Sequence, residues 1–287
     1  MTQIGSPETE DEWLIRLRKI VEEVRALETQ PEGYWVPESG SAASRDDKET
    51  LVVKMSDSVS YFILTASQCL SQLADGLEKD DGVLRPIAPF VLLRTALIGA
   101  SQALWVLQPK SRADRVSRLD RLTLESYRNM GNLVTEMSLE SWISDEVTSS
   151  LESSAAHLSL LREKYKEHKG KIEKPINTEI IKDVADILAP QESNRAIHVA
   201  IRELWQSSSG YTHAFPWVMH VRHNDPEDRI QTPEGNSRRI QTTYRDLGSG
   251  LGVVLLLVKT VLELWETRST NWHSDRLFPL TPVSRLE

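Results

Sequence analysis

The chain has 287 residues, 39% hydrophobic and 26% charged, with a formal net charge of -8. The apolar fraction is too high for a disordered chain, and 13 Gly and 13 Pro are too few for a fibrous or low-complexity one. The single Cys excludes an internal disulfide and a Cys-based zinc site. The negative charge argues against broad coating of nucleic acid, although it leaves room for a local basic surface.

The N-terminal residues and the two apolar segments of the chain indicate its compartment. The first residues are polar and acidic, unlike a signal peptide, which has a basic start and an apolar run. Residues 87–107 are apolar and long enough for a membrane span, but Arg94 interrupts them. Residues 250–262 are shorter than the roughly 20 residues that a span requires. We therefore expect a cytoplasmic protein without a membrane partner.

Prolines divide the chain into long segments with helical periodicity. We expect a disordered start over residues 1–10 and a single helical domain over residues 11–268, with an irregular tail over 269–287. Within the domain, helices are expected over residues 11–27, 48–78, 86–107, 111–137, 145–168, 177–188, 192–209 (or as far as 213) and 244–268.

Two segments of the domain carry turn signals instead. Residues 30–46 are expected to be an irregular loop, in which Tyr34 and Trp35 could anchor the loop to the body. Residues 215–241 contain Pro and Asn-Asp-Pro turn signals, and they predict an irregular loop or a small hairpin of residues 217–222 and 238–242. The predicted fold class is therefore all-α, an antiparallel bundle of about eight helices.

The helix over residues 86–107 is predicted to be the central one. Ala96, Gly99, Ala100 and Ala103 lie on one of its faces at helical spacing. Small residues allow a neighbouring helix to approach closely.

The sequence contains no motif for a phosphate loop, a dinucleotide site, a zinc protease or a nucleophile elbow. None of the seven His residues follows a Glu by three positions, as di-iron bundles require. His220 and His223 are three apart, but they fall in a loop-like stretch that is typical of solvent-exposed chain. We therefore expect neither a metal nor a cofactor.

Arg94 stands inside the apolar segment 90–97. A buried guanidinium must be paired, because an unpaired buried charge is costly. Arg94 is therefore either a structural residue bonded to carbonyls or a carboxylate, or a cation that faces a ligand in an internal groove.

A second polar group lies near residue 210. If the helix continues through Gly210, then Arg202, Gln206, Ser209 and His213 form one stripe. Ile197, Ile201 and Leu204 then point to the core. His can transfer protons near neutral pH, and Arg can hold a phosphate with two hydrogen bonds. The alternative is an ordinary helix end, where His213 caps carbonyl groups.

Two further groups of basic residues allow phosphate binding. Arg112, Arg115, Arg118 and Arg121 spread over half of a helix circumference, which indicates either a solvated face or a basic patch for RNA. Arg162 and His168 have the spacing of metal-independent ribonucleases, in which His is the acid or base and Arg stabilises the phosphorane. An exposed helix end explains that pair equally.

Segments 94–105 and 205–213 resemble the Arg-containing central helix and the later Ser-x-x-x-His helix end of HEPN-like helical proteins of unknown function from actinobacteria. The resemblance covers residues 50–215. It implies a helical bundle, frequent dimerisation and a distant link to abortive-infection and toxin ribonucleases. The chain departs from that pattern at Ile98, where an acidic residue is expected.

Three functions remain open. The first is an RNA-directed, HEPN-like stress or phage-defence protein with His213, Arg94 and Arg202 as catalytic residues. Its phosphate contacts would be Arg112, Arg115, Arg118, Ser209 and Gln206. The second is a non-catalytic scaffold that forms homo-oligomers or binds a protein partner. It is suggested by Trp35, Trp142, Trp217 and Trp272. The third is a bundle that binds a small acidic ligand at Arg94. Convergence of Arg94, Arg202 and His213 on one groove would favour the first.

Overall fold

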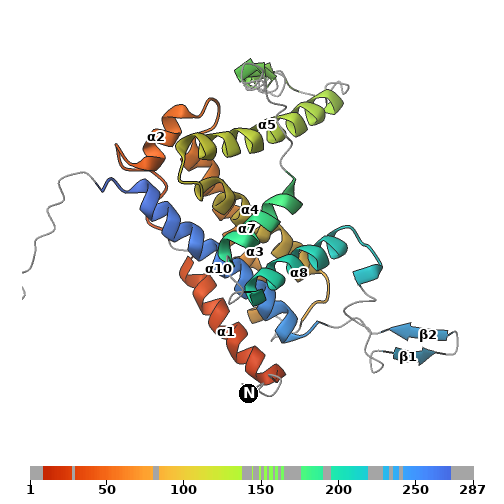
Figure 1. Cartoon of the computed structure of the whole chain (residues 1–287). Coiled ribbons are helices and arrows are strands. Elements are labelled where there is room, and N and C mark those ends of the chain that lie inside the picture. Colours follow the sequence, from red (N-terminus) through yellow and green to blue (C-terminus); the bar gives the residue numbers. More distant parts are fainter. Residues whose placement is uncertain are drawn as a thin grey trace, which may run out of the picture.

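The computed structural model describes residues 9–27, 30–79, 84–137, 176–189, 195–218, 229–232, 235–238 and 242–272, together with isolated residues between 144 and 164. Its helices are α1 (Glu10–Leu27), α2 (Ala42–Glu49), α3 (Met55–Lys79), α4 (Ala88–Leu107), α5 (Arg112–Met137), α7 (Asn177–Leu188), α8 (Arg195–Thr212) and α10 (Tyr244–Ser269). Strands β1 (Arg229–Thr232) and β2 (Gly235–Arg238) form an antiparallel hairpin that lies apart from the helices (Figure 1). The predicted all-α bundle is confirmed.

Helix ends follow local chemistry. The Ser41 hydroxyl caps α2 by accepting the backbone N–H of Ser44 at 3.1 Å, and Thr243 caps α10 in the same way through Asp246. These hydroxyls satisfy N–H groups that have no partner within the helix. Pro89 stands in the first turn of α4, where its missing N–H costs nothing.

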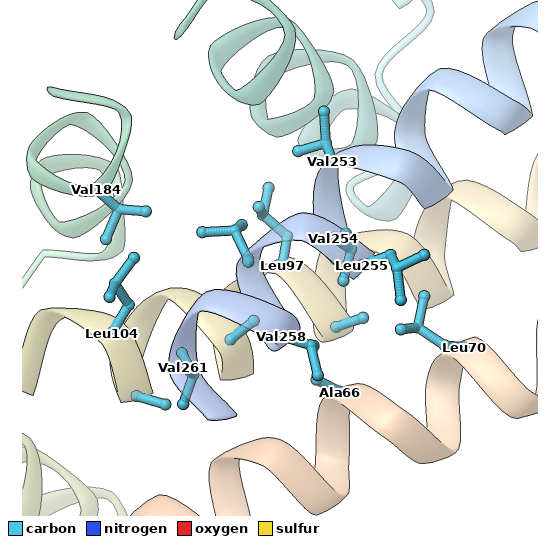
Figure 2. Packing of buried hydrophobic residues seen from close by; sticks show 14 of the residues in the cluster. Ala66, Leu70, Leu97, Leu104, Val184, Val253, Val254, Leu255, Val258 and Val261 are labelled. Atoms are coloured by element: carbon cyan, nitrogen blue, oxygen red, sulfur yellow. The ribbon is translucent and has the colours of Figure 1, made fainter. Parts of the chain in front are cut away.

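Helix α4 is central, as the sequence predicted. It packs against α3, α5, α7, α8 and α10. In Figure 2, Leu97 and Leu104 of α4 point into the space between Val184 of α7 and the valines of α10. Leu97 is fully buried and Leu104 is 1% exposed, so the centre of the bundle is apolar.

The small-residue face of α4 lets α3 approach closely. Ala96, Ala100 and Ala103 are fully buried, and a Cβ atom added to Gly99 would lie 2.6 Å from the carbonyl oxygen of Phe62. Two helix backbones therefore touch at Gly99.

We expect Gly99→Ala to lower the free energy of unfolding by about 1–3 kcal/mol, the usual cost of overpacking, although Ala is the better helix former. Urea denaturation followed by circular dichroism measures this. Gly76→Ala in α3 is the matched control, because nothing lies within 4 Å of the added methyl group. We expect that control to be neutral or stabilising by up to about 1 kcal/mol. Equal effects of the two changes would refute the close approach.

Some predicted boundaries were wrong. The helix expected from residue 48 begins at Met55, because residues 42–49 form the separate helix α2 within and beyond the expected loop. The Asp47 carboxylate accepts both the backbone N–H and the hydroxyl of Ser56, at 2.9 and 2.8 Å, and so joins α2 to the first turn of α3. The hairpin uses residues 229–232 and 235–238 instead of the strands expected around 217–222 and 238–242.

The helix expected from residue 192 runs from Arg195 to Thr212. The expected helix 145–168 lies mostly outside the described residues, as do residues 1–8 and 273–287.

Helices α4 and α10 are long and apolar enough to cross a membrane by length and composition alone. The bundle buries 67% of the apolar stretch of α4 and 56% of that of α10. Core helices of soluble proteins meet the same criteria. The cytoplasmic location therefore stays an expectation.

Candidate functional site

Arg94 joins α4 to α8. Its guanidinium lies 4.8 Å from the ring centre of Trp205, and its Nε donates a hydrogen bond to the Ser209 hydroxyl at 3.2 Å. The aromatic face attracts the cation, and the hydroxyl fixes its orientation. The Arg94 guanidinium is thus held in place by residues of α8, and Ser209 lies 115 positions further along the sequence.

The charge of Arg94 is not neutralised within the part of the chain that the structure describes. Its side chain is half-buried, and this burial lowers the pKa of the guanidinium. Among the described residues, no carboxylate forms an ion pair with it. A guanidinium has five N–H donors, and Ser209 uses one of them. Arg94 is therefore a fixed cation with donors left for an anion.

The exposed face of α8 carries the predicted polar stripe. Arg202, Gln206 and His213 are exposed and Ser209 is half-buried, whereas Ile201 and Leu204 are 0% and 2% exposed. The helix continues through Gly210 to Thr212, which the stripe required. The predicted division of α8 into a core face and a polar face is confirmed.

Gly210 shapes the chain that follows α8. An added Cβ atom would lie 1.9 Å from the side chain of Val218 and 2.9 Å from that of Trp217, so only glycine fits here. The backbone N–H of Phe215 bonds to the Gly210 carbonyl at 2.9 Å, and Ala214 takes a positive φ of 53°. This tight turn places the side chains of residues 213–217 beside the end of α8.

His213 extends the polar face. Its backbone N–H bonds to the Ser209 carbonyl at 3.0 Å, and its ring centre lies 5.6 Å from that of Phe215. Within the described part of the chain, the imidazole forms no hydrogen bond, so it does not cap the helix as the alternative interpretation required. Phe215 is 51% and Trp217 42% exposed, and they add aromatic surface next to the imidazole.

The structure brings these residues together along a surface, not around a closed pocket. Arg94 touches Ser209, whereas Gln206 and His213 lie about one helical turn from Ser209 on either side. Arg202 lies two turns away, about 10 Å along the axis. The hollows beside α1, at the start of α4 and between α3 and α5 are lined by other residues. This arrangement suits an extended ligand better than a small enclosed one.

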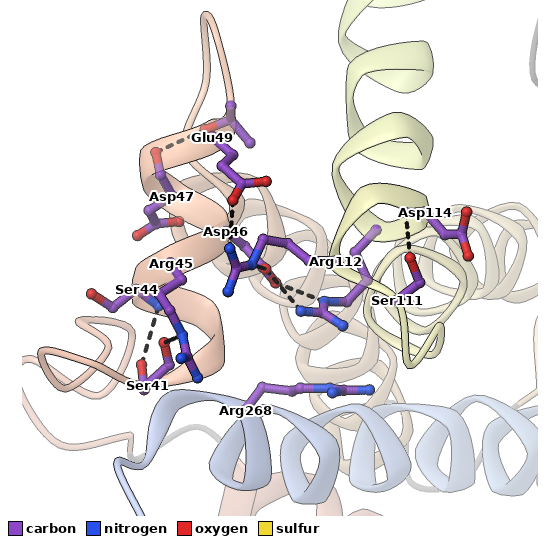
Figure 3. Close-up of polar contacts among 12 residues, drawn as sticks. Ser41, Ser44, Arg45, Asp46, Asp47, Glu49, Ser111, Arg112, Asp114 and Arg268 are labelled. Carbon is purple, nitrogen blue, oxygen red and sulfur yellow. Dashed lines mark hydrogen bonds and ion pairs between the residues drawn. The ribbon is translucent and has the colours of Figure 1, made fainter. Parts of the chain in front are cut away.

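The predicted basic stripe of α5 is structural. Arg115 is 3% exposed, and its Nε and Nη2 donate to the two Asp46 oxygens at 2.7 and 2.8 Å. Arg112 pairs with Glu49 at 2.5 Å. Figure 3 shows Arg112 between the Asp46 and Glu49 carboxylates. Arg115 is thus on neither a solvated face nor a phosphate-binding one, and both interpretations of this residue were wrong.

The next two arginines of the stripe contact Trp105. Arg118 donates to the Trp105 carbonyl at 2.6 Å and stacks on the indole ring at 4.8 Å, and Arg121 stacks on it at 5.5 Å. The expected phosphate contacts on α5 therefore pack within the protein. The spacing of the arginines does not indicate these contacts, because Trp105 belongs to α4 and the Asp46 and Glu49 carboxylates belong to α2.

The remaining candidates lie outside the described residues, namely Arg162, His168, His220 and His223. Across the described part of the chain, no group of three or more His, Cys, Asp or Glu side chains could hold a metal ion.

No protein-family model matches the chain, and no curated protein or solved structure is significantly similar to it. Functional inference therefore depends on the geometry around Arg94.

Proposed function

We propose that this chain is an RNA-directed helical protein that binds a single strand along the α8 surface. This surface is defined as Arg94, Arg202, Gln206, Ser209 and His213, with Phe215 and Trp217 at its end. The observation that carries the proposal is Arg94: a half-buried cation, oriented by Trp205 and Ser209, without a carboxylate partner among the described residues.

The chemistry of the α8 surface favours a single-stranded nucleic acid. Arginine guanidinium groups hold phosphates, and exposed aromatic rings provide stacking platforms for bases. Arg94 and Arg202 supply the cations, while Phe215 and Trp217 supply the rings. The net charge of -8 restricts such binding to a local surface. The resemblance of segments 94–105 and 205–213 to HEPN-like proteins supports the same class of partner. It suggests a stress or phage-defence role in the cytoplasm.

Metal-independent cleavage is the catalytic extension of this proposal. His213 would transfer a proton at the attacking or leaving oxygen, and Arg94 would stabilise the charge of the phosphorane. The exposed imidazole, free of hydrogen bonds within the described chain, leaves both nitrogens available to a substrate.

We expect Arg94→Met to weaken binding of a fluorescent single-stranded RNA about tenfold or more, because a charged hydrogen bond contributes about 1.5–3 kcal/mol. The methionine keeps an apolar stem over Trp205. Fluorescence anisotropy at fixed salt measures the affinity, and circular dichroism checks that helix content is unchanged. Arg18→Met is the matched control, since Arg18 is an exposed arginine of α1, a helix that packs against α3 and α10.

Equal weakening by Arg94→Met and Arg18→Met would show that only net charge matters, and would refute the α8 surface as the RNA site. In the same assay, His213→Ala separates binding from chemistry. Loss of cleavage with binding retained supports the catalytic role, whereas unchanged cleavage excludes it.

A second candidate is a scaffold that forms homo-oligomers. Val199, Phe215 and Trp217 are 53%, 51% and 42% exposed along and beyond α8, and apolar exposure of this kind also occurs at protein interfaces. Light scattering distinguishes the two: a stable dimer that does not bind RNA favours the scaffold.

A further inference from the structure

The register of the hairpin β1–β2 places its basic residues on one face. The register partners are Arg229 and Arg238, Ile230 and Ser237, Gln231 and Asn236, and Thr232 and Gly235. Partners in an antiparallel pair share a face, and successive residues of a strand alternate between the two faces. One face therefore carries two arginines and two amides, namely Arg229, Gln231, Asn236 and Arg238. We name it the arginine face.

The arginine face sets two like charges directly opposite each other. Residues at such positions have Cβ atoms about 4.5–5.5 Å apart, and like charges at this spacing destabilise the ladder. An anion offsets that cost, because its oxygens can accept hydrogen bonds from two guanidinium groups at once. The pairing of Arg229 with Arg238 therefore favours an anion on this face.

The hairpin has few internal sources of stability. Each strand has four residues, and among the described residues the two strands form a sheet of their own. Two-stranded hairpins are marginally stable in water. In Figure 1 the hairpin lies apart from the labelled helices. A ligand that binds the folded hairpin would therefore also stabilise it.

Arg245 adds a third cation seven positions after Arg238. It is exposed in the first turn of α10 and forms no ion pair with another described residue. A cation is unfavourable at this end of a helix, where the helix dipole favours negative charge. The stability of α10 therefore does not account for Arg245, whereas an anionic ligand near the hairpin does.

The composition of the arginine face favours a nucleic acid among anions. Guanidinium groups hold phosphates, and Gln and Asn amides bond to phosphate, sugar and base atoms. Two-stranded ribbons bind nucleic acids in other proteins. The two polar rows of the face lie about 7 Å apart along the strands, which suits a chain of linked phosphates better than a single small anion.

The arginine face lies within reach of a strand bound on the α8 surface. Ten residues separate Val218, just beyond that surface, from Arg229. A fully extended connection of this length spans at most about 40 Å. One RNA strand of moderate length can therefore contact both regions.

We propose that the arginine face of the hairpin binds the phosphate backbone of an RNA strand whose neighbouring part lies on the α8 surface. The proposal rests on the proposed function and adds a second contact region to it. Arg229 and Arg238 hold the phosphates, and the amides of Gln231 and Asn236 donate to phosphate or sugar oxygens. Arg245 adds positive charge at the start of α10.

Fluorescence anisotropy with uridine RNAs of about 4 and about 20 nucleotides tests the proposal, since single-strand sites cover about 4–16 nucleotides. We expect Arg229→Thr with Arg238→Thr to weaken binding of the longer RNA about tenfold. Its logarithmic salt slope should fall by about 1.4, because each phosphate contact with a single strand contributes about 0.7. The shorter RNA, which covers the α8 surface alone, should keep its affinity. A Thr–Thr pair is favourable on an antiparallel ladder, so the hairpin persists.

Two controls separate the arginine face from net charge. Arg18→Gln with Lys19→Gln removes the same charge from exposed positions of α1, and we expect the affinity for the longer RNA to change less than about twofold. Adding Ile230→Arg and Ser237→Arg to the threonine variant restores the charge on the opposite face of the hairpin. This variant should not regain binding.

Four results would overturn the assignment. These are an unchanged affinity and salt slope for the longer RNA, equal weakening by the α1 control, recovery by arginines on the opposite face, and a dimer that the threonine variant dissociates in light scattering. The last result would assign the face to a second copy of this acidic chain. Arg94→Met should weaken binding of both RNAs, whereas the threonine variant should affect only the longer one, so the failure of either proposal is recognised separately.

Discussion

Replacing Asp46 by alanine is expected to lower the free energy of unfolding by about 3–5 kcal/mol, the loss that follows when one partner of a buried ion pair is removed. Asp46 is fully buried, and both of its carboxylate oxygens accept hydrogen bonds from Arg115, which is 3% exposed. The truncation therefore leaves a guanidinium inside the protein without its anion. Removing a charge from the surface has no such consequence.

The effect is large because Asp46 joins several elements. Arg115 also donates to the carbonyls of Pro109 and Lys110, both at 2.9 Å, in the turn between α4 and α5. Arg268 of α10 donates to the same Pro109 carbonyl at 3.0 Å. Figure 3 shows the Arg268 side chain on the side of α10 that faces Asp46 and Arg112. Burial lowers the pKa of Arg268, the charge of Arg115 lowers it further, and Asp46 opposes both. Without Asp46, the arginines repel one another.

Urea denaturation of Asp46→Ala beside Asp114→Ala provides the comparison. Asp114 is an exposed carboxylate in the first turn of α5, where it contributes about 0.3–1 kcal/mol through the helix dipole. The double change Asp46→Leu with Arg115→Met removes both charges, and we expect it to cost less than Asp46→Ala alone. Similar losses for the two aspartate variants would contradict the role of the buried pair.

Local chemistry made most of the helices predictable. The bounds of α7 and α10 were predicted from apolar residues at helical spacing. Asn177 does not cap α7, because the N-cap residue is Ile176 and no side chain caps the helix. The small residues of α4 identified the central helix, because a face of small residues can be recognised from the sequence of one helix alone. The polar stripe of α8 was predicted on the same basis, since all its members lie within 12 residues.

Contacts between distant segments could not be predicted in this way. Arg115 and Asp46 are 69 positions apart, and α2 is an eight-residue polar helix without an apolar period that would reveal it. The spacing of the α5 arginines therefore indicated a basic surface where the fold buries an ion pair. The contact between Arg94 and Ser209 likewise depends on which helices meet.

Trp265→Ala is expected to lower the free energy of unfolding by about 3–5 kcal/mol, as for other large aromatic truncations in cores. Trp265 is fully buried in α10, and its indole N–H donates to the Tyr34 carbonyl at 3.1 Å. Its ring centre lies 5.4 Å from that of Trp35. This contact anchors the segment before α2, as expected from Tyr34 and Trp35. Trp272→Ala is the control, because Trp272 is 65% exposed, and we expect a change within about 0.5 kcal/mol.

The ionisation of Tyr34 reports whether the segment before α2 is released from the core. Burial, followed by the negative charge of Glu266, raises the pKa of Tyr34 from 10.0 to about 12. The unfolded chain releases this proton first, so the stability that Tyr34 contributes is complete below pH 10 and is lost as the pH rises to about 12. In Trp265→Ala, release of the segment would expose the phenol and return its pKa toward 10.0, which ultraviolet titration detects. An unchanged pKa beside a large loss of stability would mean that Trp265 fills the core without holding Tyr34 in place.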